Sequence, residues 1–259
     1  MLISIVTPSL NSERYIRATL DSIWSSPAAH PGETVEHIVV DGGSTDRTLE
    51  IVSEFPSRVL TGRDSGMYDA INKGLAAATG DVFGYVNSDD EVTPGCLEEL
   101  FGAFGDPGTE WLVAPMIIID GPGSEVAVLR PPGGLTPAQF SALGWNCLPQ
   151  PSTYFRTEFV RRLGGFDTTF RLAGDYDLFM RALIAAKPAR LRRPLSRFRL
   201  HDANLAKNHE AMAAEAALVA EREPLPPSRR ALLHWFTKIR INVRNPKWSV
   251  GKRTGKVQY

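Results

Sequence analysis

The chain has 259 residues, of which 43% are hydrophobic and 22% charged, and it contains five Trp, so its composition excludes an intrinsically disordered protein. Its 29 basic and 29 acidic residues balance overall, but from Leu225 onward there are nine Lys and Arg and no Asp or Glu, which leaves a net charge of −9 on the first 224 residues. Two cysteines, Cys96 and Cys147, are too few for a disulfide framework or a metal cluster, so we expect buried thiols in a reducing compartment.

Short apolar segments alternate with helical patterns through the first part of the chain. Strands are predicted for residues 2–6, 37–40, 58–60 and 81–86, and helices for residues 12–25, 45–55 and 66–78. This alternation favours an α/β fold, in which a mostly parallel sheet is covered by helices on both faces.

Beyond Pro94 the pattern is looser. Strands are predicted for residues 111–119, 125–129 and, as an edge strand, 191–200, and helices for residues 157–163, 175–186 and 203–223. Pro224 to Pro227 interrupt the chain before its basic end. We therefore expect one domain over residues 1–223, divided near residue 92, and a C-terminal tail over residues 224–259.

Three polar clusters directly follow predicted strands. They are Thr7-Pro8-Ser9-x-Asn11, Asp41-Gly42-Gly43-Ser44 and Asn87-Ser88-Asp89-Asp90. Because ligands of open α/β sheets collect at the carboxyl ends of the strands, we expect the three clusters to share one binding site. Helix capping explains any one of them equally well, so the argument depends on the three occurring together.

The adjacent carboxylates of Asp89 and Asp90 carry the strongest signal. Unpaired, they would repel each other, and a divalent cation shared with a diphosphate would remove that repulsion. The alternative is an exposed acidic turn.

In combination, these clusters resemble the family 2 glycosyltransferases, which have the GT-A fold with a Rossmann-like central sheet. Residues 64–74 are similar to a motif of a bacterial branch that builds surface polysaccharides, and residues 164–167 and 174–181 match the family's acceptor-side motif. The resemblance covers about residues 1–205. It implies a nucleotide-sugar half over about residues 1–92 and an acceptor half over about residues 93–223.

The resemblance implies a metal-dependent inverting transferase that moves a hexosyl or N-acetylhexosaminyl group from a nucleotide sugar to an acceptor hydroxyl. The implied donor-binding residues are Thr7, Pro8, Ser9, Asn11, Asp41, Asp64, Lys73, Ser88 and Asp89. Mg²⁺ or Mn²⁺ would be held by Asp90 and Asp89, with His201 as a further candidate ligand, and would act as a Lewis acid on the leaving group. A hydrogen-bonded surface histidine is the alternative for His201, and a surface pair with Asp69 is the alternative for Lys73.

Asp175 occupies the position of the family's catalytic aspartate, so the resemblance implies that it is the general base, with a helix N-cap as the alternative. Asp177 lies two residues on, and we expect it to have a structural role only. Asp41 can only accept hydrogen bonds, which suits the base of a UDP, dTDP or GDP donor equally well. Gln150 stands where similar sequences often carry His, so the acceptor's identity is not implied.

The C-terminal tail mixes apolar and basic residues. Over residues 228–256 this composition is typical of an interfacial helix on an anionic membrane, and a helix packed on the domain with a solvated basic rim is the alternative. Similar enzymes often extend a glycan carried on a polyprenyl diphosphate lipid, which would be the acceptor here. No apolar run approaches the ~20 residues that span a bilayer, and no signal peptide is visible, so we expect a cytoplasmic protein, held at the inner face of the membrane if the tail binds lipid.

Other functions remain as alternatives. A sugar nucleotidyltransferase would want a Gly-rich, basic phosphate loop, which residues 7–11 are not. A catalytically silent nucleotide-sugar-binding or scaffold protein would have no need to retain Asp41, Asp89, Asp90 and Asp175 together. No nucleic-acid motif accompanies the basic tail, and we expect no nucleic-acid partner.

Overall fold

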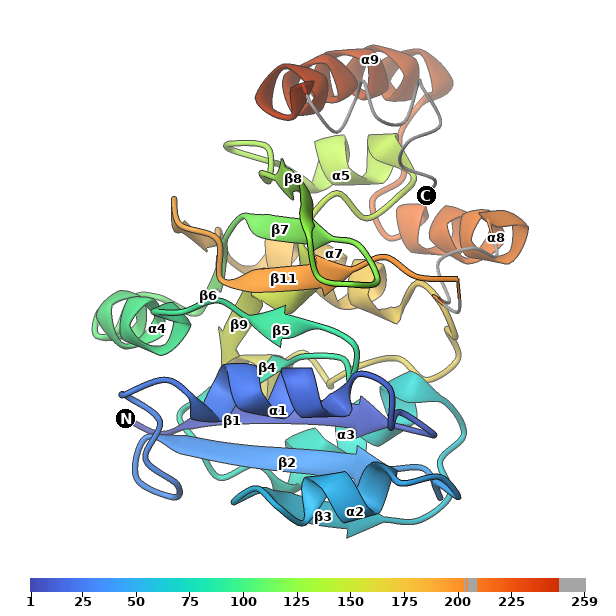
Figure 1. The fold of residues 1–259 in the computed structure, drawn as a ribbon. Coiled ribbons are helices and arrows are strands. Elements are labelled where there is room, and N and C mark those ends of the chain that lie inside the picture. The colour runs from blue at the N-terminus through green and yellow to red at the C-terminus, as the bar shows by residue number, and fades with distance from the viewer. Residues whose placement is uncertain (203, 205–208, 247–259) are drawn as a thin grey trace.

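The computed structural model describes residues 1–202, 204 and 209–246, which form two sheets and the helices around them (Figure 1). The larger sheet has seven strands in the order β10-β6-β9-β4-β1-β2-β3. Its strands are β1 (Ile3–Ser9), β2 (Val35–Asp41), β3 (Arg58–Thr61), β4 (Val82–Tyr85), β6 (Trp111–Val113), β9 (Thr153–Arg156) and β10 (Ala189–Arg190). Neighbouring strands are parallel except at β9, which runs antiparallel to both β4 and β6. The mostly parallel sheet predicted from the sequence is confirmed.

Helices cover both faces of this sheet. They are α1 (Ile16–Trp24), α2 (Thr48–Val52), α3 (Met67–Ala77), α4 (Cys96–Phe104), α6 (Thr157–Arg162) and α7 (Gly174–Ala185). On one face, Ile71 of α3 and Phe179 of α7 belong to the same core as Trp111 of β6. On the other face, Ile23 of α1 and Leu100 of α4 pack with the strands. The central sheet is therefore buried on both sides, as its continuous apolar strands require.

The predicted helices form, but most are shorter than their sequence patterns. The helix expected over residues 12–25 begins at Ile16, because Ser12 to Tyr15 form a turn, and the one expected over residues 45–55 is only the five-residue α2. Within α1, Ile16, Leu20 and Ile23 are fully buried, and this i, i+4, i+7 spacing is the amphipathic pattern that predicted the helix.

The second sheet corrects two predictions. It has four strands in the order β5-β11-β7-β8, with bounds β5 (Glu91–Val92), β7 (Met116–Ile119), β8 (Glu125–Leu129) and β11 (Ser196–Arg199). The single strand predicted over residues 111–119 is wrong, because the chain leaves the large sheet after Val113 and enters the small one at Met116, with Pro115 between. The edge strand predicted over residues 191–200 is also wrong, because β11 lies between β5 and β7.

Strand β9 has no counterpart among the predicted elements, and it completes the large sheet. It lies between β4 and β6, so the sheet contains strands from both predicted halves of the domain. Its close approach to β4 depends on Gly84, where a Cβ atom would lie 2.3 Å from the ring of Tyr154. The division near residue 92 stays a prediction, but the two halves share this sheet.

Three helices lie at the far end of the molecule from β3 (Figure 1). They are α5 (Pro137–Leu143), α8 (His209–Ala220) and α9 (Pro227–Arg244), and α9 packs on α5. Residues 203 and 205–208 of the helix predicted over 203–223, and residues 247–259 of the tail, lie outside the described residues. Among the described residues, no helix is both long and apolar enough to cross a membrane. Both cysteines are buried and free, which confirms the prediction of buried thiols.

Candidate active site

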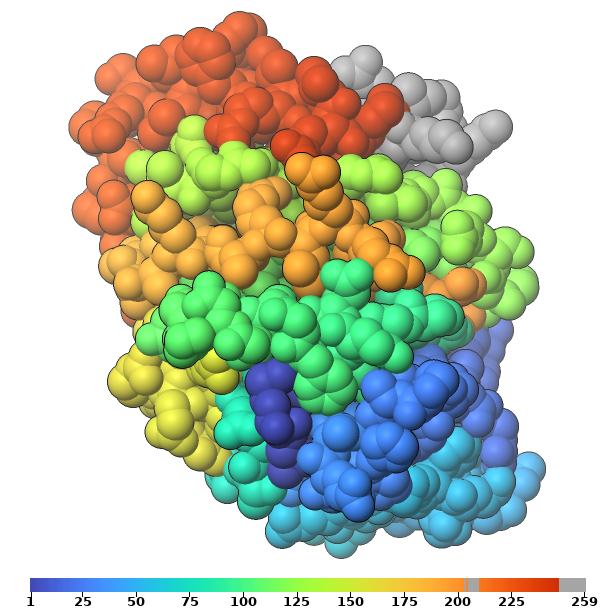
Figure 2. Space-filling model, turned by 90° about the vertical axis from the view of Figure 1, so that its left-hand side faces the viewer, coloured from blue at the N-terminus to red at the C-terminus, as the bar shows by residue number. Residues whose placement is uncertain are grey.

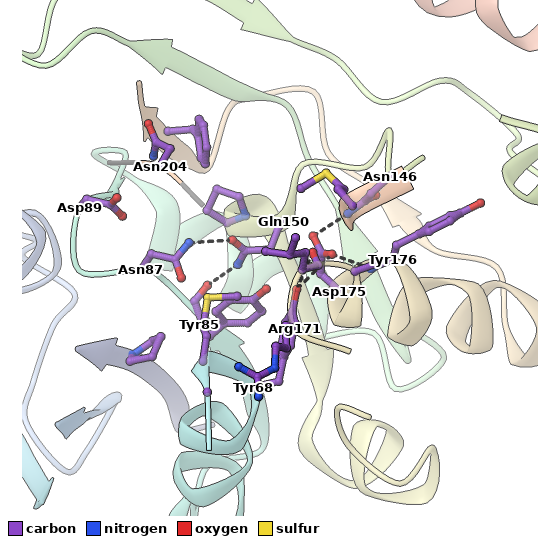
Figure 3. A pocket seen from close by; sticks show the side chains of 18 of the residues that line it. Tyr68, Tyr85, Asn87, Asp89, Asn146, Gln150, Arg171, Asp175, Tyr176 and Asn204 are labelled. Carbon is purple, nitrogen blue, oxygen red and sulfur yellow. Dashed lines mark hydrogen bonds between the residues drawn. The ribbon is translucent and has the colours of Figure 1, made fainter. Parts of the chain in front are cut away.

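A cavity of about 680 Å³ opens beyond the carboxyl ends of β1 and β4 (Figure 3). Its polar wall includes Ser9, Asp64, Ser88 and Asp89, which come from three separate segments of the chain. The opposite wall is formed by the second sheet, α8 and the segment before η1 (Gln150–Ser152). The sequence prediction that the strand-end clusters meet at one site is therefore supported for the first and third clusters, through Ser9, Ser88 and Asp89, whereas no residue of the Asp41–Ser44 cluster lines the cavity.

Asp175 lies on the wall of this cavity, half-buried, in the first turn of α7. The side-chain amide of Asn146 donates to its Oδ2 at 2.8 Å, and the backbone N–H of Tyr176 donates to its Oδ1 at 2.7 Å. The hydroxyl of Tyr68 lies 3.4 Å from Oδ1 (Figure 3). The N-cap position of α7 belongs to Ala173, so Asp175 does not cap the helix. Its carboxylate is held in place and faces a space where a ligand fits.

Burial raises the pKa of Asp175 above its ordinary value, although the hydrogen bonds from Asn146, Tyr176 and Tyr68 oppose part of that effect. A carboxylate with a raised pKa is a stronger base than an exposed aspartate. Asp177 has different surroundings, because it is fully buried and pairs with Arg181 and Arg222. The structural role predicted for Asp177 is confirmed.

The loop before Asp175 is fixed by helix α8. The carboxylate of Glu215 accepts hydrogen bonds from the backbone N–H groups of Arg171, Leu172 and Ala173, at 3.0, 2.8 and 2.8 Å. One side chain thus satisfies three successive backbone donors immediately before α7. This contact ties the position of the Asp175 loop to that of α8.

A second group of polar side chains lies across the cavity. The side-chain amide of Gln150 donates to the carbonyl oxygen of Tyr85 at 3.0 Å, and Asn87 donates to the Gln150 side-chain oxygen at 3.3 Å (Figure 3). Gln150 thereby connects the end of β4 to η1. The hydroxyls of Ser12 and Ser88 lie 2.7 Å apart and join the β1 loop to the same turn.

The two carboxylates predicted as a metal pair have different environments. Asp89 lines the cavity, and its Oδ2 lies 2.7 Å from Nε2 of His201. Asp90 is fully buried instead, where it accepts from the backbone N–H of Arg199 at 2.9 Å. Burial and the charge of Asp89 raise the pKa of Asp90 well above its usual range. The pair therefore does not face the cavity together, because successive residues of this turn point in different directions.

The site still has a carboxylate that suits a divalent cation. Mg²⁺ usually keeps several waters and takes one or two protein carboxylates together with substrate phosphates, so Asp89 is sufficient as the protein ligand. His201 is adjacent and half-buried. Among the described residues, no group of three or more His, Cys, Asp or Glu is arranged to hold a metal ion. The described residues thus fit a cation that takes further ligands from a bound phosphate, rather than one that these residues alone enclose.

Four predicted donor-binding residues are outside the cavity lining. The side chain of Thr7 is fully buried and lies 3.0 Å from His37 Nε2. Asn11 accepts from the backbone N–H of Thr45 at 2.9 Å. Asp41 is fully buried and accepts from the backbone of Gly43 and Ser44. Lys73 pairs with Asp69 at 3.1 Å, as its alternative interpretation predicted. Pro8, by contrast, does line the cavity.

These contacts connect Thr7 to the neighbouring strand β2 and give Asn11 and Asp41 a role in shaping the loops that follow β1 and β2. Both Asp41 oxygens accept hydrogen bonds within the residue's own turn, because the Ser44 hydroxyl donates to Oδ1 at 2.5 Å. Direct contact between these side chains and the donor stays a prediction.

Sequence reasoning missed several cavity residues. Asn146 and Tyr68 contact the Asp175 carboxylate, and Tyr68 lies inside a segment that had been singled out without a role for this residue. Arg171 also lines the cavity. Asn146 follows Trp145, which also lines the cavity, so a polar residue beside an aromatic one was the only signal that this stretch of sequence offered.

A sequence profile described as Glycosyl transferase family 2 matches residues 4–163, more than half of the chain. The chain belongs to this family. The matched part contains the donor-side strands and Asp89, whereas Asp175 follows it.

Two glycosyltransferases are similar over most of the chain, and a third over about a third of it. An uncharacterized glycosyltransferase of Mycobacterium tuberculosis (strain CDC 1551 / Oshkosh), MT1564, is 28% identical over 204 residues, which cover 76% of this chain and 74% of the relative. The uncharacterized glycosyltransferase alr2836 of Nostoc sp. is 23% identical over 227 residues, which cover 83% of this chain and 68% of the relative. A PGL/p-HBAD biosynthesis glycosyltransferase of Mycobacterium bovis is 38% identical over 97 residues, 35% of this chain and 36% of its own.

Solved glycosyltransferase structures share the fold. S. aureus TarS 1–349 in complex with UDP-GlcNAc superposes with a TM-score of 0.69 at 20% identity, covering 94% of this chain and 73% of TarS. The mannosyltransferase PcManGT from Pyrobaculum calidifontis, in complex with GDP-Man and Mn²⁺, superposes with a TM-score of 0.65 at 18% identity. The match covers 91% of this chain and 68% of PcManGT. These neighbours confirm the GT-A fold, and the family assignment makes this protein a glycosyltransferase.

Proposed function

We propose that this glycosyltransferase moves a sugar from a nucleotide sugar to an acceptor hydroxyl by one inverting displacement, with Asp175 as the general base. The observation that carries the proposal is the Asp175 carboxylate, held by Asn146 and Tyr176 on the wall of a cavity whose opposite wall presents Asp89. We further propose that the enzyme acts in the assembly of a bacterial surface polysaccharide or glycolipid.

Asp175 would accept the proton of the acceptor hydroxyl as that oxygen attacks the anomeric carbon of the donor. The hydrogen bond from Asn146 fixes the orientation of the carboxylate, and its raised pKa favours the transfer of that proton. The bond from the anomeric carbon to the diphosphate oxygen breaks as the new glycosidic bond forms. A single displacement of this kind inverts the anomeric configuration.

The donor's diphosphate would lie along the wall formed by Asp64, Ser88 and Asp89. Asp89, with His201 beside it, would hold Mg²⁺ or Mn²⁺, which would neutralise charge on the leaving diphosphate. Nucleotide-sugar complexes of TarS with UDP-GlcNAc and of PcManGT with GDP-Man and Mn²⁺ support this class of donor and a metal.

The cavity wall formed by the second sheet, α8 and the segment before η1 supports the proposal of a lipid-linked acceptor. It includes the apolar side chains of Met116, Leu129, Leu148 and Met212, which would be poor partners for a fully hydroxylated glycan. Arg171 contributes a positive charge to the same cavity, as a phosphate group near the accepting sugar would require. A glycan on a polyprenyl diphosphate combines these features.

The Asp175→Asn variant tests the base. Asparagine retains the size of the side chain but cannot take the proton, so turnover should fall by ~10²–10⁴ while the affinity for the nucleoside diphosphate is unchanged. Release of nucleoside diphosphate in the presence of acceptor measures turnover, and calorimetry measures affinity. Asp21→Asn, on the exposed face of α1, is the matched control and should transfer normally. Near-native turnover by Asp175→Asn would reject this role, and a product with retained configuration by NMR would reject the single displacement.

The metal has a separate test. At a hundredfold excess of nucleoside diphosphate over its Kd, binding should stabilise the protein by ~2.7 kcal/mol in Mn²⁺ and by much less in EDTA, as measured by thermal unfolding. Asp89→Asn should remove most of this difference. Equal stabilisation in Mn²⁺ and EDTA would reject a metal at this site.

A further inference from the structure

Helix α9 has two opposite faces with different surroundings. One face packs on the body of the protein: Thr237 and Ile241 are buried, and Asn245, just beyond the helix, exchanges hydrogen bonds with the backbone of Arg130 at 2.7 and 3.0 Å. His234 lies on the same side, with its Nδ1 3.1 Å from the carbonyl oxygen of Ala142. The helix is therefore held on the body of the protein by one face, and its opposite face is exposed.

The outward face carries a continuous apolar stripe. It consists of Leu232, Trp235, Phe236, Ile239 and Val243, which are 56%, 58%, 50%, 40% and 73% exposed. Their spacing of i, i+3, i+4, i+7 and i+11 places them on one side of a helix with 3.6 residues per turn, about half a turn from Thr237 and Ile241. The helix forms the outer end of the molecule, beyond α5 (Figures 1 and 2). An apolar stripe of this length on a surface marks a site of interaction.

Basic side chains flank this stripe. Arg229 and Arg244 are exposed and Arg240 half-buried on one flank, and Lys238 is exposed on the other. Residues 224–246 contain no Asp or Glu, in contrast to the acidic body of the chain. Exposed aromatics between cations are the combination found in helices that lie in the headgroup region of an anionic bilayer.

We propose that α9 docks the protein on an anionic phospholipid surface, with the apolar stripe inserted among the headgroups and the flanking cations against lipid phosphates. Charge decides between this occupant and a second copy of the chain. Two copies that pair through the stripe would bring the flanking arginines and lysine of one α9 close to those of the other, with no acidic residue of the helix to offset them. An anionic membrane offers an apolar interior to the stripe and negative charge to the flanking cations.

Vesicle flotation tests the proposal with the full-length protein. Vesicles of phosphatidylcholine and phosphatidylglycerol should bind the protein at low salt, and vesicles of phosphatidylcholine alone should bind it much more weakly. Arg229→Gln with Lys238→Gln should lower partitioning about fivefold for each charge removed, with little effect at high salt. Trp235→Ser with Phe236→Ser should lower it about tenfold or more at every salt concentration.

A matched pair of substitutions controls for the loss of apolar surface. Ile184 and Leu218 are 52% and 57% exposed on other helices, and Ile184→Ser with Leu218→Ser should leave partitioning unchanged. Asp175→Asn should float like the native protein, which separates this proposal from the proposed reaction. Equal binding to neutral vesicles, or no binding to anionic ones, would overturn the proposal. So would a concentration-dependent dimer, seen by light scattering, that Trp235→Ser with Phe236→Ser abolishes.

Discussion

Acidification should destabilise the native protein through His37. This residue of β2 is 2% exposed, and its ring nitrogens lie 3.0 Å from the hydroxyl of Thr7 and 2.8 Å from that of Ser57. Burial lowers the pKa of His37 to about 3, because a charged imidazole there would lose its hydration. In the unfolded chain, by contrast, the same group titrates near its ordinary value of about 6.5.

The sign and size of the effect follow from this difference. Below about pH 6.5 the unfolded state binds a proton that the folded state does not, so the free energy of unfolding falls as the pH falls. The loss approaches about 1.4 kcal/mol per pH unit and continues down to the folded pKa. Between pH 7.5 and pH 5.0 it amounts to about 2 kcal/mol, a large part of the 5–15 kcal/mol typical of a folded domain.

Urea unfolding of the native protein and of His37→Gln, followed by Trp fluorescence across this pH range, measures the effect. Glutamine has no titration, so the difference in stability between the two proteins should change by about 2 kcal/mol between the extremes of pH, whatever the variant's absolute stability. His30→Gln, at an exposed position in the turn before β2, should keep the native pH dependence. If the native and His37→Gln curves run parallel, His37 does not stay neutral in the folded protein and the reasoning fails.

Two further predictions concern the aspartates of α7. Asp177→Ala should destabilise the protein by about 3–5 kcal/mol in chemical denaturation, because it leaves Arg181 and Arg222 without their buried partner, whereas Asp69→Ala at the exposed pair with Lys73 should cost at most about 1 kcal/mol. Because the pKa of Asp175 is raised, transfer activity should be lost on acidification at a pH above the ordinary aspartate value of about 4, and a pH–rate profile whose acid limb lies below that value would contradict the assignment.

The parts of the fold that the sequence predicted are those with strong local periodicity. Strands β1 and β2 are largely apolar and almost entirely buried. Helix α1 between them buries the apolar residues that recur at helical spacing. Strand β9 could not be found in this way, because its four residues carry no alternation and its position depends on partners far along the chain. The apolar run from Trp111 to Ile119 gives no sign of which sheet each part joins, and only Pro115 hints at the break.

In the candidate site, the residues within recognisable motifs could be predicted from the sequence, but the directions of their side chains could not. Asp89 and Asp175 were identified from their place in recognisable motifs, and both line the cavity. The direction of a side chain within a turn is not encoded locally, which is why Asp90 was expected beside Asp89 but is buried against Arg199. Asn146 was missed because its role arises only where α7 approaches the segment before η1, a contact that sequence spacing does not reveal.

The antiparallel insertion of β9 also constrains the order in which the sheet can be assembled. Val82 of β4 pairs with Arg156 of β9, which lies 74 residues further along the chain. During synthesis, β4 therefore has no β9 to pair with until those residues have been made. Until then β4 is an edge strand, with backbone groups and the apolar Phe83 open to pairing with other chains. A fragment ending near residue 92 would keep that open edge permanently. The half predicted to bind the donor is therefore expected to be prone to aggregation when it is made without β9.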